Sequence, residues 1–161
     1  MLAETYLFHV ERIMSLITLA RNHAEQLILV CDGGWQDRSM VLQEVASEQG
    51  LVYTAIGLPF AKALLGQSPR DRSLSAIEML DNLSSSSSAG LALDHIEILF
   101  EPDLHIDPLR SVQALALRHL VLLSWPGKHS SGRLSYAEPE HLEYRTYPVD
   151  NILVYSLENL T

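Results

Sequence analysis

The sequence has one cysteine and few basic residues, and both scarcities limit what the protein can be. Cys31 has no partner in a chain of 161 residues, so a disulfide within the chain is excluded, and a reducing cytoplasm is expected. Because Cys31 lies in an apolar run, we expect a small buried hydrophobic side chain. Lys and Arg number 11 against 20 Asp and Glu, for a formal net charge of -9. This balance disfavours direct binding to the DNA backbone.

Long apolar runs are also missing. The first residues include Glu4, His9, Glu11 and Arg12, so they lack the uninterrupted apolar core of a signal peptide. No other stretch reaches the ~18 apolar residues that span a bilayer. We therefore expect a cytoplasmic protein without a membrane partner. Hydrophobic residues still make up 47% of the chain, which is enough to form the core of one domain covering residues 1–161.

Several signatures of catalysis and metal binding are absent as well. There is no GxSxG elbow for a nucleophilic serine and no HExxH pattern for zinc. The seven histidines show no paired spacing with the cysteine, so their pattern does not indicate a structural metal site. These histidines are His9, His23, His95, His105, His119, His129 and His141.

Helical and strand-like patterns alternate along the chain. Residues 1–24 contain an amphipathic helix, whose apolar stripe is Leu7, Val10, Ile13, Met14, Ile17 and Ala20. Residues 27–31 are all apolar, as in a strand buried on both faces of a parallel sheet. A helix over 39–48 and a strand over 51–56 complete a βαβ unit. The alternation predicts a three-layer α/β domain with a mainly parallel central sheet.

The second half continues the alternation. Ser68 and Asp107 each precede a proline, which predicts two helix starts. Residues 91–94 and 119–124 read as buried strands, and the C-terminal part is expected to form short strands or hairpins. The Ser-rich segment 84–90 is expected to be a flexible loop. The expected inner faces of the two helices are Leu74, Ile77, Met79 and Leu80, then Leu109, Val112, Leu115 and Ala116.

The turn after the first strand is the expected ligand site, because helix N-terminal amides there can hold phosphate. Laid over the phosphate-loop pattern GxxxxGK[ST], residues 32–39 match only at Ser39. Asp32 and Asp37 replace the two glycines and add negative charge, which should weaken nucleotide binding. Arg38 replaces the lysine with a wide planar group. The candidate nucleotide-binding residues are Gly33, Gly34, Trp35, Gln36, Asp37, Arg38 and Ser39.

Two further strand ends carry candidate catalytic residues. Asp94 is placed to hold Mg²⁺ together with Ser39 if a nucleotide binds, and Glu97 and Glu101 are less well placed alternatives. Ser124 could contact a γ-phosphate. A second interpretation stays open, in which Asp94 caps a turn, His95 lies on the surface and Ser124 only ends a strand.

Five segments together resemble one family. They are residues 93–100, 107–110, 123–127, 132–139 and 143–148. In this order they are similar to the BrxF family, the small P-loop proteins of type 3 bacteriophage exclusion (BREX) systems. The resemblance implies a P-loop NTPase-like fold. It also implies a cytoplasmic antiviral subunit that acts beside a larger ATPase, a DNA methyltransferase and a phosphatase-like protein.

Three hypotheses about function follow. In the first, the chain is an accessory BREX subunit that acts through protein–protein assembly, especially with the large ATPase, and binds ATP and Mg²⁺ weakly or not at all. In the second, it is an active Mg²⁺-dependent ATPase, completed by an arginine from a neighbouring subunit. In the third, the chain contacts DNA directly through Arg110, Arg118, Lys128 and Arg133. In the first two hypotheses, the chain reaches DNA only through the complex. A homo-oligomer is left open.

Overall fold

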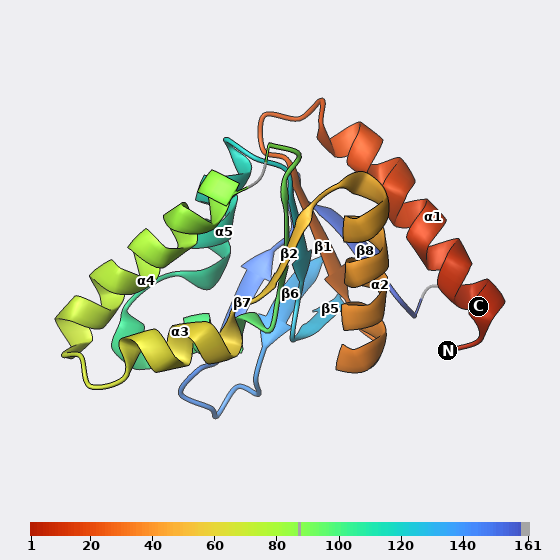
Figure 1. Ribbon diagram of the computed structural model, residues 1–161. Helices are drawn as coiled ribbons and strands as arrows, with labels where there is room; N and C mark the ends of the chain where they lie inside the picture. Colours follow the sequence, from red (N-terminus) through yellow and green to blue (C-terminus); the bar gives the residue numbers. More distant parts are fainter. Residues whose placement is uncertain (87, 159–161) are drawn as a thin grey trace.

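The computed structural model describes residues 1–86 and 88–158, and its centre is a five-stranded sheet. The strand order is β2-β3-β4-β1-β8, and every neighbouring pair is parallel (Figure 1). The prediction of an α/β domain with a mainly parallel central sheet is confirmed. The strands are β1 (Leu27–Cys31), β2 (Val52–Ala55), β3 (Leu91–Asp94), β4 (Val121–Ser124) and β8 (Leu153–Ser156).

Helices cover both faces of this sheet (Figure 1). On one face lie α1 (Ala3–Ala20) and α2 (Trp35–Gln49); on the other lie α3 (Gly57–Leu64), α4 (Pro69–Leu83) and α5 (Pro108–Ala116). Alternate residues of each strand therefore enter different cores: Leu29 packs towards α5, whereas Ile28 packs towards α1 and α2. Burial on both faces explains why the central strands carry uninterrupted apolar runs. Short 3-10 helices are η1 (Ser84–Ser86), η2 (Ile96–Phe100) and η3 (Pro102–Leu104).

A small antiparallel sheet follows β4. It consists of β5 (Lys128–Ser130), β6 (Arg133–Tyr136) and β7 (Arg145–Pro148) in that order. Trp125 is fully buried and anchors it, because the indole Nε1 donates to the carbonyl of Ser135 at 3.0 Å. Gly127 permits the close approach, since a Cβ there would lie 1.6 Å from the same carbonyl oxygen. The expected hairpins thus form a separate three-stranded sheet beyond the end of β4.

Local signals predicted the helix starts well. The Ser68 hydroxyl accepts from the Asp71 N–H, and the Asp107 carboxylate accepts from the Arg110 N–H, as expected of N-caps. All four predicted inner residues of α5 are buried. The expected loop 84–90 instead begins with η1, and Ser87 lies outside the described residues.

Three predicted core positions are wrong. Leu7 of α1 is exposed, and the buried residues on that turn are His9 and Val10. In α4, Leu74 and Ile77 are 57% and 45% exposed, whereas Ala76 and Leu80 are buried. The reason is that α4 contacts the core through a narrow stripe with a spacing of four residues, so apolar residues two or three positions away face outward.

None of the helices in the described ranges combines the length and the apolar character needed to cross a membrane.

Candidate functional site

The candidate site lies at the carboxyl ends of β1 and β4. These strands are neighbours, but their connections run in opposite directions across the sheet. After β1 the chain continues to β2 at one edge, and after β4 the next strand of this sheet is β8 at the other edge. In open parallel sheets, ligands bind beyond the strand ends at such a reversal. A cavity of about 660 Å³ opens here, between the β1–α2 turn and the small sheet. Its lining includes Asp32, Gly33, Trp35, Arg38, His129 and Glu158.

The β1–α2 turn is shorter than the phosphate-loop pattern requires. Only residues 32–34 lie between β1 and α2, so helix α2 begins at Trp35 rather than near Ser39. Of the candidate nucleotide-binding residues, Gly33 and Gly34 lie in the turn. The other five, Trp35, Gln36, Asp37, Arg38 and Ser39, belong to the first turns of α2. Asp32 and Gly33 both adopt left-handed backbone angles, with φ of 59° and 64°, which reverses the chain tightly.

The side chain of Arg38 fills the crevice between β1 and β4. Arg38 is only 7% exposed. Its Nη1 donates to the carbonyls of Asp32 and Gly33 at 3.1 and 2.9 Å, and its Nε donates to Ser124 Oγ at 3.1 Å. The turn therefore directs two carbonyl oxygens at an internal cation. A phosphate site would need the opposite polarity, with N–H groups pointing inward.

Ser39 and Asp94, the two residues predicted to hold Mg²⁺, are in direct contact. Ser39 Oγ donates to Asp94 Oδ2 at 2.5 Å, and the Tyr53 hydroxyl donates to the same oxygen at 2.7 Å. The other oxygen, Oδ1, accepts from the His95 N–H at 2.8 Å. Asp94 is thus buried with donors on both oxygens. Burial raises the pKa of Tyr53, and the hydrogen bond to Asp94 raises it further.

Parts of both sequence interpretations are visible in this geometry. Asp94 Oδ1 accepts from the N–H of the next residue, His95, whose backbone is left-handed with φ of 53°. The His95 ring is partly exposed and lies 5.7 Å from the exposed indole of Trp35. Ser124 is buried and bonded to Arg38, so it does more than end a strand. Glu97 lines the cavity.

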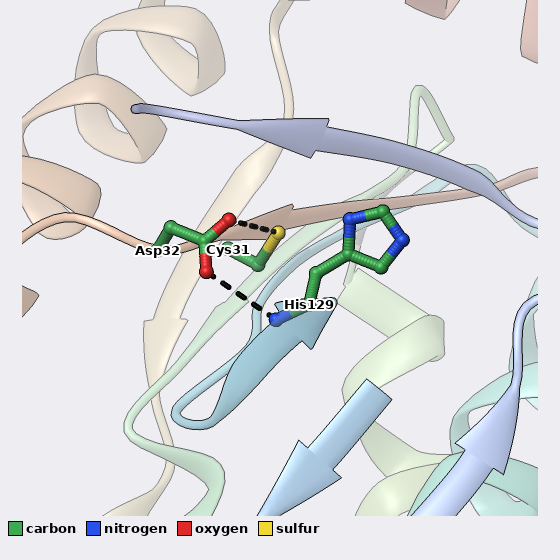
Figure 2. Close-up of side chains that lie close together, drawn as sticks. All are labelled: Cys31, Asp32 and His129. Carbon is green, nitrogen blue, oxygen red and sulfur yellow. Dashed lines mark hydrogen bonds between the residues drawn. The ribbon is translucent and has the colours of Figure 1, made fainter. Parts of the chain in front are cut away.

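Sequence reasoning missed a cluster made by Cys31, Asp32 and His129 (Figure 2). Asp32 Oδ2 accepts from the Ser156 hydroxyl at 2.5 Å and from the Cys31 thiol at 3.3 Å. Asp32 Oδ1 accepts from the backbone N–H of His129 at 3.3 Å. Burial and the neighbouring carboxylate raise the pKa of the Cys31 thiol. Asp32 and His129 are 97 positions apart in the sequence, so only the fold brings them together.

The four basic residues considered for DNA contact are already engaged. Arg110 and Arg118 lie within 3.9 and 3.0 Å of Asp107 and Asp81. In the small sheet, Lys128 lies 3.8 Å from Glu138, and Arg133 donates to Thr146. Carboxylates partner three of these four residues, which offsets their attraction for phosphate.

No significant match to the chain was found among protein-family models, curated proteins or solved structures.

Proposed function

We propose that the protein is an accessory subunit of a BREX-type anti-phage system. In this proposal its P-loop NTPase-like domain carries a degenerate nucleotide site and acts mainly through assembly with other subunits, above all the large ATPase. The residues that resemble the BrxF family motivate the choice of system. The geometry around Arg38 supports the degenerate site, and it is the observation that carries the proposal.

Arg38 argues against tight phosphate binding. Its guanidinium already donates to two carbonyls of the turn and to Ser124, in the crevice where a phosphate would have to enter. A phosphate would have to displace a buried, satisfied cation and then face the oxygens of Asp32 and Gly33. Leaving buried polar groups without partners costs about 1–3 kcal/mol each, so the closed arrangement is favoured.

The Ser39–Asp94 pair supports a P-loop NTPase-like ancestry for the site. In such enzymes a serine or threonine of the phosphate loop and an acid from a neighbouring strand hold Mg²⁺ together. Here the two side chains are 2.5 Å apart, and the hydroxyl of Tyr53 occupies a further position on the carboxylate. This pair is also the observation that favours the alternative, an active Mg²⁺-dependent ATPase.

An apolar strip on α1 supports a role in assembly. Leu7, Phe8 and Leu19 are 56%, 44% and 48% exposed on the outer side of that helix. Phe8 and Leu19 also line a second cavity of about 500 Å³, which lies between α1 and β8, an edge strand of the central sheet. Exposed apolar patches and open sheet edges are common features of protein-binding surfaces.

Calorimetric titration with ATP and Mg²⁺ tests the nucleotide part. We expect no submicromolar binding by the wild-type chain. An Arg110→Ala variant is the matched control, because Arg110 is exposed and lines a different cavity from the one at the β1–α2 turn. Submicromolar binding that Arg38→Ala abolishes and Arg110→Ala retains would contradict the degenerate site and establish the ATPase alternative.

Co-purification from cells that carry the whole defence operon tests the assembly part. We expect the large ATPase to co-purify with the wild-type chain and to be lost with the Phe8→Asp, Leu19→Asp double variant. Leu142→Asp is the control, because Leu142 is 85% exposed in the β6–β7 connection. Co-purification of none of the BREX subunits with the wild-type chain would contradict the proposal. DNA binding by the isolated chain is expected to be absent.

A further inference from the structure

We propose that Cys31, Asp32 and His129 form a Zn²⁺ site with one coordination position open to the 660 Å³ cavity. The site is distinct from the Ser39–Asp94 pair and does not depend on nucleotide binding. It follows from the donor set and its geometry.

The three residues supply ligand types that suit zinc. Thiolate sulfur, imidazole nitrogen and carboxylate oxygen all bind Zn²⁺, whereas Mg²⁺ and Ca²⁺ prefer oxygen ligands only. The ligand atoms all lie within 4.8 Å of one another, and the Cys31 Sγ to Asp32 Oδ2 distance is 3.3 Å. Tetrahedral zinc holds its ligand atoms roughly 3.3–3.8 Å apart. A small movement of the His129 side chain therefore completes the geometry.

The fold fixes two of the ligands and leaves the third adjustable. Cys31 is fully buried at the end of β1, and the left-handed backbone of Asp32 turns its carboxylate towards the thiol (Figure 2). Hydrogen bonds from the Ser156 hydroxyl and the His129 N–H orient that carboxylate, as is usual for metal ligands. The His129 ring is only partly buried and makes no hydrogen bond to another residue in the described ranges.

Charge and protons balance in this site. When Zn²⁺ binds, the Cys31 thiol loses its proton to solvent, and the thiolate and the Asp32 carboxylate together neutralise the ion. His129 binds as the neutral imidazole. With three protein ligands, water from the cavity takes the fourth position, which is the arrangement of catalytic rather than structural zinc sites.

Titration of the full chain with Co²⁺ tests the site, after treatment with a chelator and without nucleotide. We expect one equivalent to bind, with a thiolate-to-cobalt charge-transfer band and the visible bands of a tetrahedral ion, and Zn²⁺ to displace it. Cys31→Ser should abolish the charge-transfer band. His129→Ala should weaken binding at least about tenfold. His23→Ala is the control, because His23 is exposed in the α1–β1 connection.

His129 is not part of the core, so His129→Ala still tests the site if Cys31→Ser fails to fold. Circular dichroism shows whether each variant is folded. The proposal is overturned if the wild-type chain shows no charge-transfer band, or if His129→Ala binds Co²⁺ as tightly as the wild type. A negative result for the zinc site does not bear on the proposed function, because the ATP titration measures nucleotide binding with Mg²⁺ and its dependence on Arg38.

Discussion

Arg38 Nε lies 3.1 Å from Ser124 Oγ, and this contact joins the start of α2 to the end of β4. The same guanidinium donates to the carbonyls of Asp32 and Gly33. Arg38 therefore joins three segments: the start of α2, the β1–α2 turn and the end of β4. Its role in stability can be measured separately from any role in ligand binding.

The first prediction concerns these contacts of Arg38. Arg38→Met keeps most of the aliphatic volume but removes the donors from two carbonyls and one buried hydroxyl. We expect the free energy of unfolding to fall by about 2–4 kcal/mol, measured by urea denaturation. Arg110→Met, at a side chain that is 85% exposed, should change it by less than about 0.5 kcal/mol. Equal stability of the two variants would show that the contacts of Arg38 do not stabilise the fold.

The second prediction concerns the close approach at Gly127. A methyl group there would overlap the Ser135 carbonyl, which lies 1.6 Å from the position of the new Cβ. We expect Gly127→Ala to lower the unfolding free energy by about 2 kcal/mol or more and to shift Trp125 fluorescence to the red as β5 and β6 move away. Gly34→Ala is the control, because its Cβ meets nothing closer than 3.6 Å. An unshifted emission spectrum would contradict the expected displacement.

Much of the fold could be predicted because its signals are local. Residues 27–31 and 121–123 are apolar runs, as expected of strands covered by helices on both faces. Ser68 and Asp107 cap their helices through contacts three residues away. The start of α2 carries no such signal. Its N-cap, Gly34, has no side chain to cap the helix, so no local signal indicates that the turn holds only three residues.

The candidate site was only partly predictable for a similar reason. The Ser39–Asp94 contact follows from the rule that all strands of a parallel sheet end at one edge, because Ser39 lies on the helix after β1 and Asp94 ends β3. The inward carbonyls around Arg38 depend instead on backbone angles at Asp32 and Gly33. The approach of His129 depends on how the small sheet folds back, which no short pattern in the sequence records.

The third prediction concerns Cys31. Burial raises the pKa of its thiol, and the Asp32 carboxylate raises it further. Because the thiolate is the reactive form, we expect alkylation by iodoacetamide at pH 8 to be at least about a hundredfold slower in the metal-free native chain than in urea. Mass spectrometry gives both rates. Comparable rates in the two states would show that the thiol is accessible at the end of β1.

The last prediction concerns His9, which is buried on α1 and hydrogen-bonded through Nδ1 to the Tyr155 hydroxyl of β8 at 2.8 Å. Burial lowers the pKa of His9 below its ordinary value of 6.5, and the Asp37 charge opposes that shift only in part. The unfolded chain therefore takes up the proton more readily than the folded chain does. Stability from this residue is complete above about pH 6.5 and is lost as the pH falls below that value.

We expect urea midpoints of the wild type to be flat between pH 8 and 7 and to fall between pH 6.5 and 5 as His9 contributes to the loss. In His9→Asn, an amide oxygen can take the place of Nδ1 and accept from Tyr155, so the variant should lose part of this slope even if it is less stable at every pH. His23→Asn, at an exposed histidine, should keep the wild-type slope. If His9→Asn and the wild type lose stability in parallel below pH 6.5, the acid sensitivity arises elsewhere, since replacing His9, whose pKa burial lowers, must flatten the curve.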